Sequence, residues 1–225
     1  MNYQIDAPGS AIRTTVKLPA SKSISNRALI LNALSYSAYD VENLSDCDDT
    51  NLMVKALNSN DRDFNVGAAG TTMRFLTAFL SKVVGEWTIT GTERMKNRPI
   101  KVLVDALNAL GARIEYMEKE GYPPLRIFGS ALQGGEISLP GNVSSQYISA
   151  ILMIAPLTEN GVTLHLEGAI ISRPYIHITL QLMEQYGVRA SWTENTIKVL
   201  PQEYKPIRFT VESNWSAASY SYEIM

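Results

Sequence analysis

The sequence is poor in the residues that disulfides and metal sites require. Among 225 residues there is one cysteine, Cys47, and there are two histidines. One cysteine excludes an internal disulfide framework, and two histidines leave little for a metal site. The net charge of −2 argues against a nucleic-acid partner. Since no apolar run approaches the length of a membrane span and no signal-peptide pattern opens the chain, we expect a cytoplasmic protein without a membrane partner.

The segment 18–27, LPASKSISNR, concentrates serine hydroxyls and two cations between an expected strand and an expected helix. Alternating apolar residues at 12–18 predict the strand, and the apolar run at 28–34 predicts the helix. A helix start offers unpaired N–H groups and the positive end of its dipole. With Lys22 and Arg27 beside it, this start suits an anion such as phosphate or carboxylate. A serine cap with two solvated cations explains the same residues.

Two further segments repeat the pattern of a small-residue turn before an apolar helix. Residues 67–74 read GAAGTTMR, and residues 141–146 read GNVSSQ. Three such turns favour an anion site over three independent caps. Among the cations near these openings, Lys22 and Arg98 are favoured as ligand contacts over Arg74 and Arg173.

The second and third of these regions form an internal repeat. Pro99 and Pro174 lie 75 residues apart near the starts of two helices, and Gly111 and Gly187 lie 76 apart at their ends. Each repeat reads as strand, helix, strand, helix and a two-stranded hairpin, and the first region is a shortened copy. We therefore predict an α/β (α+β) fold of three βαβαββ repeat units, with helices packed inside and sheets outside, at about 19–65, 66–130 and 131–211.

Three local predictions follow from helix signals. The acids in 46–49 and Thr50 are expected to cap the helix at 51–57 rather than to act as catalytic acids or metal ligands. Pro99 is expected at the first position of the helix that precedes Gly111. Residues 214–225 read as a further capped helix.

Five segments resemble the 5-enolpyruvylshikimate-3-phosphate synthase (3-phosphoshikimate 1-carboxyvinyltransferase) family, and they occur in the family's order. The resemblance implies one domain of a two-domain fold that transfers the enolpyruvyl group of phosphoenolpyruvate to the 5-hydroxyl of shikimate 3-phosphate. It implies no metal and no organic cofactor, and a monomeric parent enzyme. The segments are LPASKSISNR at 18–27, AGTTMR at 69–74, RMKNRPI at 94–100, VSSQY at 143–147 and SRPYI at 172–176.

The resemblance also assigns residues to the two substrates. Lys22 corresponds to the family's lysine at phosphoenolpyruvate, where an ammonium can neutralise charge and assist proton transfer, and it is the candidate catalytic residue. Gly70 corresponds to a glycine that lets the backbone approach phosphoenolpyruvate, and Arg98 to an arginine that clamps it. Gln146 also reaches toward this second substrate. The positions that match contacts to shikimate 3-phosphate are Ser23, Arg27, Ser144, Ser145, Gln146, Ser172 and Tyr175.

The chain departs from the family pattern in places. Ala68 and Phe75 stand where the family has asparagine and proline, which bears on where the helix begins, and Asn214 stands where an aspartate is common. We expect the N-terminal half of the enzyme, with the acidic general base in a missing C-terminal domain. The expected divisions are an N-terminal strand at 1–18 that associates with that domain, a substrate-binding domain at 19–211, and the interdomain crossover with the start of the second domain at 212–225.

Three other interpretations stay open. An isolated half would bind shikimate 3-phosphate without turnover, because catalytic positioning needs both sides of a closing cleft. UDP-N-acetylglucosamine enolpyruvyl transferase shares fold and donor, but its loop cysteine has no counterpart in the basic turn at 91–98. A P-loop enzyme is disfavoured because residues 67–72 lack the Gly-Lys-Ser/Thr ending.

Overall fold

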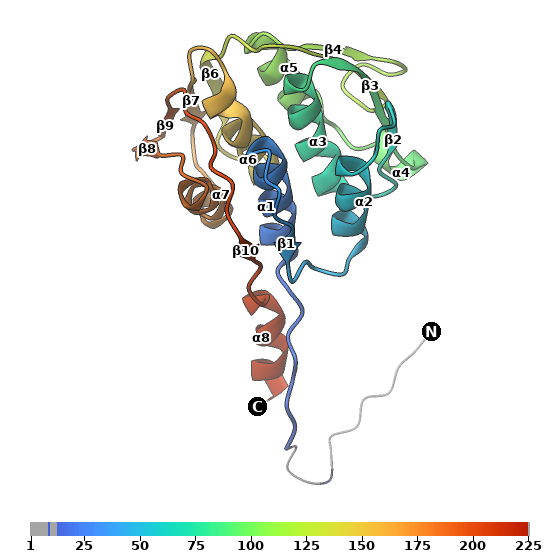
Figure 1. Ribbon diagram of the computed structural model, residues 1–225, viewed down its shortest axis with the longest axis vertical. Coiled ribbons are helices and arrows are strands. Elements are labelled where there is room, and N and C mark those ends of the chain that lie inside the picture. Colours follow the sequence, from blue (N-terminus) through green and yellow to red (C-terminus); the bar gives the residue numbers. More distant parts are fainter. Residues whose placement is uncertain (1–8, 10–12, 225) are drawn as a thin grey trace.

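The computed structural model describes Gly9 and residues 13–224 (Figure 1). It contains two four-stranded sheets with the same strand order. In each sheet the first two strands pair in parallel and the other pairings are antiparallel. The predicted mixed α/β class is confirmed. The first sheet has the order β2 (Asp63–Asn65), β3 (Gly85–Thr90), β5 (Leu125–Gly129), β4 (Arg113–Tyr116), and the second β6 (Gly135–Pro140), β7 (Val162–Glu167), β9 (Thr196–Val199), β8 (Ala190–Thr193).

Helices connect the strands of each sheet in the same sequence. In the first sheet α3 (Gly70–Lys82) links β2 to β3, and the short α4 (Glu93–Lys96) and α5 (Lys101–Ala109) lead to the hairpin of β4 and β5. In the second sheet α6 (Ser145–Ile154), with a 3-10 turn at Ala155–Leu157, and α7 (Arg173–Gln185) take the corresponding places. Gly111 and Gly187 follow α5 and α7 with φ of 98° and 88°, the left-handed conformation that ends a helix most easily at glycine. Both predicted hairpins are confirmed.

The N-terminal region pairs with a strand near the C-terminal end of the chain. It contains α1 (Lys22–Leu34), β1 (Val41–Glu42) and α2 (Asp48–Leu57). β1 pairs in parallel with β10 (Phe209–Thr210), and Val41 is buried with Ala28 and Val211. The N-terminal region has no hairpin after α2, because α2 leads directly into β2 of the first four-stranded sheet. Its β structure is the two-stranded sheet of β1 and β10.

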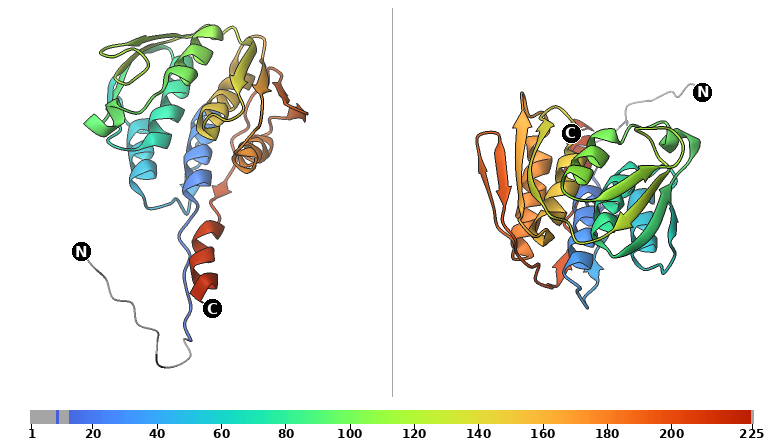
Figure 2. Two further views of the ribbon diagram at one scale, coloured as in Figure 1. Left: turned by 180° about the vertical axis from the view of Figure 1, so that it is seen from behind. Right: turned by 90° about the horizontal axis from the view of Figure 1, so that it is seen from above.

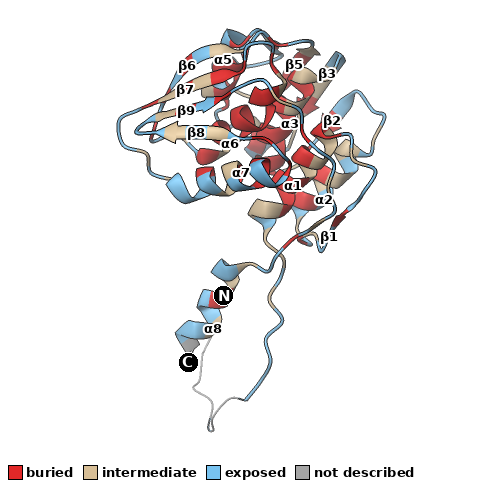
Figure 3. Ribbon diagram, turned by 60° about the vertical axis from the view of Figure 1, so that its left-hand side comes forward, coloured by how far each residue is buried: buried red, intermediate tan, exposed pale blue. Residues whose placement is uncertain are grey.

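The core lies around α3 and α6. All residues of α6 except Gln146 are buried, and most of α3 is buried as well. Because nearly every side of these two helices is buried, neighbouring elements cover them all round instead of leaving one side to water. Figure 3 shows buried residues gathered in the helices, and Figure 2 shows the two sheets on different sides of them. Within 13–224, no helix has the length and hydrophobicity of a membrane-spanning segment.

The predicted strand at 12–18 is wrong over the part that the structure describes. Residues 13–17 are exposed and unpaired, and only Ala20 forms a bridge, with Ser213. A strand needs a neighbour for its N–H and C=O groups, and the described chain offers none to residues 13–18. The rest of the expected segment at 1–18 falls at 1–8 and 10–12, outside the described residues. The predicted C-terminal helix is present as α8 (Trp215–Ile224), which projects from the body beside the extended segment (Figure 1).

The expected place of Pro99 at the first position of its helix is also wrong. α5 begins at Lys101 after the N-cap Ile100. The N–H of Ile100 donates to the carbonyl of Gly121 at 2.9 Å, and the carbonyl of Pro99 accepts from the Tyr147 hydroxyl at 2.6 Å. These tertiary hydrogen bonds hold the segment outside the helix. Pro174, in contrast, lies in the first turn of α7.

Candidate functional site

The starts of α1, α3 and α6 meet through a chain of polar contacts. Lys22 in the first turn of α1 pairs with Asp49 of α2, with Nζ and Oδ2 3.7 Å apart. The backbone N–H of Thr71, in the first turn of α3, donates to Oδ1 of Asp49 at 3.0 Å. The Thr71 hydroxyl in turn accepts from Nε2 of Gln146, in the first turn of α6, at 3.2 Å. Three of the predicted helix starts therefore lie together.

The acidic segment before α2 does not cap α2 as expected. Its N-cap is Cys47, without a side-chain cap hydrogen bond, and Asp48 and Asp49 lie inside the first turn. The Asp49 side chain instead satisfies an N–H at the start of α3, and its carbonyl accepts from the Thr72 hydroxyl at 2.6 Å. α3 itself has Ala69 at its N-cap, which has no side-chain acceptor to offer. An acid from another helix supplies what the local sequence lacks.

Two guanidinium groups occupy the space in front of Gly70. A Cβ at this position would collide with the Arg98 guanidinium and would approach Nη1 of Arg74 to 2.7 Å. Nη1 of Arg74 donates to the Gly70 carbonyl at 2.7 Å, and its guanidinium lies 5.5 Å from the centre of the Tyr147 ring. A larger residue at position 70 would therefore displace the end of an arginine side chain that now lies against the glycine backbone.

Arg98 is half-buried, and its guanidinium has no hydrogen bond or ion pair among the described residues. Burial lowers its pKa first, the positive charges of Arg74 and Arg94 lower it further, and Asp49 partly offsets them. The preceding hydrogen bond from Tyr147 to Pro99 fixes the backbone beside it. A half-buried fork with free donors beside a helix start is suited to a carboxylate or phosphate.

Arg27 lies further inside than the other predicted contacts. It is 2% exposed, and burial lowers its pKa to about 10. Its Nε donates to the Thr179 hydroxyl at 2.7 Å, Nη1 to the Ser23 carbonyl at 2.8 Å, and Nη2 to the Ser149 hydroxyl at 2.9 Å. A longer contact of 3.5 Å joins Nη2 to the Tyr175 carbonyl. Arg27 therefore ties α1, α6 and α7 together, and its contact with a ligand stays a prediction.

The predicted serines and tyrosine lie at the openings of α6 and α7. Ser144 is the N-cap of α6 and accepts from the N–H of Gln146 at 3.4 Å, while Ser145 is buried. Ser172 is the N-cap of α7 and makes no side-chain cap hydrogen bond. Tyr175 is 46% exposed, so its ring is available to a ligand. Arg27 contacts Ser149 of α6 and Thr179 and the Tyr175 carbonyl of α7, so it joins α1 to both helices.

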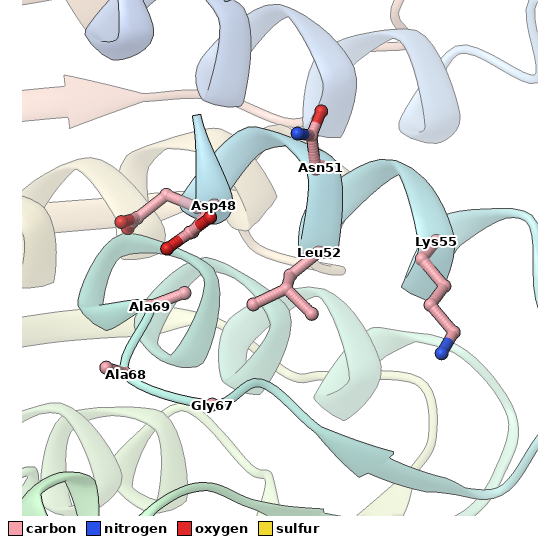
Figure 4. Close-up of a pocket in the computed structure, with 8 residues that line it drawn as sticks. Asp48, Asn51, Leu52, Lys55, Gly67, Ala68 and Ala69 are labelled. Carbon is pink, nitrogen blue, oxygen red and sulfur yellow. The ribbon is translucent and has the colours of Figure 1, made fainter. Parts of the chain in front are cut away.

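A hollow of about 540 Å³ lies next to these residues, between α2 and the turn at 67–69 (Figure 4). Asp48 and Lys55 lie toward opposite ends of it. Its wall also includes Ala69, the N-cap of α3, and Asp49 of α2, which accepts the N–H of Thr71. None of the predicted substrate-binding residues lines it. The hollow therefore lies beside the place where the starts of α1, α3 and α6 meet, and does not coincide with it.

Sequence reasoning missed Asp49 and Thr71 as partners in this site and ranked Arg74 low. The acids at 46–49 signal a helix start, but nothing local indicates that one of them faces another helix. Arg74 is 5% exposed, and its Nε has no hydrogen-bond partner among the described residues. With Lys22 and Arg98 it makes a cationic cluster that Asp49 only partly neutralises.

The fold and these contacts define an α/β protein whose meeting helix starts suit a small anionic molecule. The sequence pattern of the family "EPSP synthase (3-phosphoshikimate 1-carboxyvinyltransferase)" matches residues 7–60 and 57–222. The chain belongs to this family.

Individual relatives agree. The chain is 60% identical over 225 residues to the 3-phosphoshikimate 1-carboxyvinyltransferase of Bacteroides fragilis (strain YCH46). This alignment covers 100% of the chain and 55% of that protein. Against the protein of the same name from Vibrio campbellii (strain ATCC BAA-1116) the identity is 43% over 242 residues, covering 95% of the chain and 57% of that protein. The chain thus spans about half the length of these relatives.

A solved structure supports the fold. EPSP synthase from Acinetobacter baumannii superposes with a TM-score of 0.80 over 91% of this chain and 51% of that chain. The sequence identity in this match is 21%, so the likeness concerns the fold.

Proposed function

We propose that the protein transfers the enolpyruvyl group of phosphoenolpyruvate to the 5-hydroxyl of shikimate 3-phosphate and releases phosphate. The observation that carries this proposal is the meeting of the α1, α3 and α6 starts in a chain that matches the EPSP synthase family. Two phosphorylated substrates favour a site where several cations and helix N-termini come together, and these helix starts with Lys22 and Arg98 offer both. The proposed place of action is the cytoplasm.

In this proposal Lys22 and Arg98 hold phosphoenolpyruvate beside Gly70. The side chain of Lys22 is 48% exposed, so its ammonium can reach a ligand and assist proton transfer. Ser144, Ser145 and Gln146 take shikimate 3-phosphate at the start of α6. Ser23, Arg27, Ser172 and Tyr175 complete its contacts.

We further propose that this chain is one domain of two, built from three βαβαββ units with helices inside, the first shortened. The shared order of the two four-stranded sheets supports the repeat. Its division would be 1–18, 19–211 and 212–225, with the proposed acidic general base in a second domain, the chain's proposed partner. Since the chain spans about half the length of its relatives, a binding module without turnover is the second candidate function.

Calorimetric titration of the chain with shikimate 3-phosphate, with shikimate as control, tests the site. The proposal expects binding that requires the phosphate. A chain that binds both compounds equally, or neither in the presence of the second domain, would contradict it. Phosphate release from phosphoenolpyruvate and shikimate 3-phosphate, assayed with and without the second domain, then separates an enzyme from a binding module.

A further inference from the structure

Asp49 is the carboxylate at the centre of the cationic cluster. Its Oδ1 accepts the backbone N–H of Thr71 at 3.0 Å, and its Oδ2 lies 3.7 Å from Nζ of Lys22. Its side chain is 19% exposed. One carboxylate therefore contacts both the start of α3 and the candidate catalytic lysine of α1.

The same carboxylate balances charge in the cluster. Asp49 is the acidic group whose field opposes the positive charges of Arg74 and Arg94 at Arg98. Lys22, Arg74 and Arg98 supply three positive charges against this one negative charge. An anion that approaches Lys22 therefore competes with Asp49 for the lysine ammonium group.

We propose that Asp49 is a positioning residue that fixes the start of α3 through Thr71 and holds Lys22 until an anionic substrate takes its place. This inference rests on the proposed function for the identity of the anion. Its two halves use different oxygen atoms, so they can be separated. The cap needs only an acceptor, whereas the hold on Lys22 needs a negative charge.

The substitution Asp49→Asn separates them, and Asp48→Asn is the matched control. Asparagine keeps an oxygen for the N–H of Thr71 but loses the charge. Asp48 is an exposed acid in the same turn, without an ion pair among the described residues. Asp49→Ala removes both the cap and the charge.

The first measurement is titration of the chain with inorganic phosphate. Asp49→Asn should bind phosphate about two- to fivefold more tightly than the unmodified chain, the change that corresponds to losing one partly exposed ion pair. Asp48→Asn should leave the affinity unchanged. The amide of Thr71 should stay protected from hydrogen exchange in Asp49→Asn and lose protection in Asp49→Ala. Unchanged or weaker phosphate binding in Asp49→Asn would overturn the proposal, because a residue that only caps cannot hold Lys22 from a ligand.

A second measurement needs no ligand. Acetic anhydride should acylate Lys22 faster, relative to Lys55, in Asp49→Asn than in the unmodified chain or in Asp48→Asn, because the amine is released from its carboxylate. Equal rates would overturn the proposal. If the chain binds no phosphate yet Lys22 reacts faster in Asp49→Asn, the positioning role stands, and titration with shikimate 3-phosphate in the presence of the second domain tests the proposed function separately.

Discussion

Arg27 and Arg98 are two predicted substrate contacts with opposite surroundings. The Arg27 guanidinium is buried and donates to hydroxyl and carbonyl groups of α1, α6 and α7. The Arg98 guanidinium is half-buried and has no acceptor among the described residues. The same side chain is a structural tie where the protein supplies acceptors and, in our proposal, a binding group where it does not. Whether protein acceptors occupy the donors therefore separates the two roles better than the residue type does.

Replacement of Arg27 by Met should give the largest effect and test its role as a tie. Without Arg27, the buried hydroxyl and carbonyl groups around it lose their hydrogen-bond donor. The free energy lost in this way exceeds the free energy gained because a guanidinium no longer has to be desolvated. We expect a loss of about 2–4 kcal/mol in the free energy of unfolding, measured by urea denaturation. Arg27→Lys keeps the charge without the planar fork and should also destabilise. Full stability of Arg27→Met would place Arg27 with Arg98, among the groups left free for a ligand.

Arg98→Met should behave in the opposite way. The free energy of unfolding should change by no more than about 0.5 kcal/mol, since no described protein acceptor is lost. Affinity for phosphoenolpyruvate or inorganic phosphate should fall about tenfold or more, the cost of one charge-assisted hydrogen bond. Arg94→Met, an exposed arginine of the same segment, is the control and should keep its affinity. Equal effects of the two substitutions would reduce Arg98 to one more surface cation.

The contrast between these arginines also shows which features the sequence predicts and which depend on tertiary contacts. Local signals were enough for the helix starts at Lys22, Gly70 and Ser145 and for the glycines after α5 and α7, because capping and helix ends depend on neighbouring residues. The absent strand at 13–18 and the pairing of β1 with β10 depend on partners far along the chain.

The site was predictable to the same extent. The motifs located Lys22 and Arg98, but they could not show that Arg27 is enclosed by three helices or that Asp49 caps α3 rather than α2. Both outcomes follow from how separate helices pack. The assignments of individual residues to substrates stay predictions.

Gly70→Ala should have a moderate effect and tests whether Arg98 must lie against the α3 start. The new methyl group meets the ends of the Arg98 and Arg74 side chains, and the half-buried Arg98 can move more easily than the buried Arg74. Displacement of a flexible side chain costs about 1 kcal/mol or less in stability. Phosphate affinity should nevertheless fall several-fold in titration, because Arg98 leaves its place. Normal affinity with normal stability would show that Arg98 binds from elsewhere.

Tyr186→Phe should have the smallest effect on stability at neutral pH. It tests a buried polar group that has no hydrogen-bond partner among the described residues. Tyr186 is fully buried, and its hydroxyl has no hydrogen-bond partner among the described residues. Removing that hydroxyl should not lower the free energy of unfolding, because no described hydrogen bond is lost and an unpartnered buried polar group is destabilising. Tyr204 is the matched control, because its hydroxyl donates to the Met153 carbonyl at 2.7 Å and Tyr204→Phe should cost about 1 kcal/mol.

Alkaline pH separates the Tyr186 variant from the unmodified chain. Burial raises the pKa of Tyr186 to about 12, whereas a tyrosine in the unfolded chain has its ordinary pKa of 10.0. Between these values the unfolded state has lost a proton that the folded state keeps, so stability falls as pH rises, by up to about 1.4 kcal/mol per pH unit for one group. Urea denaturation from pH 9 to 12 should show a shallower loss in Tyr186→Phe. An identical loss in both proteins would mean that Tyr186 ionises in the folded chain as readily as in the unfolded one, so burial would not hold its hydroxyl neutral.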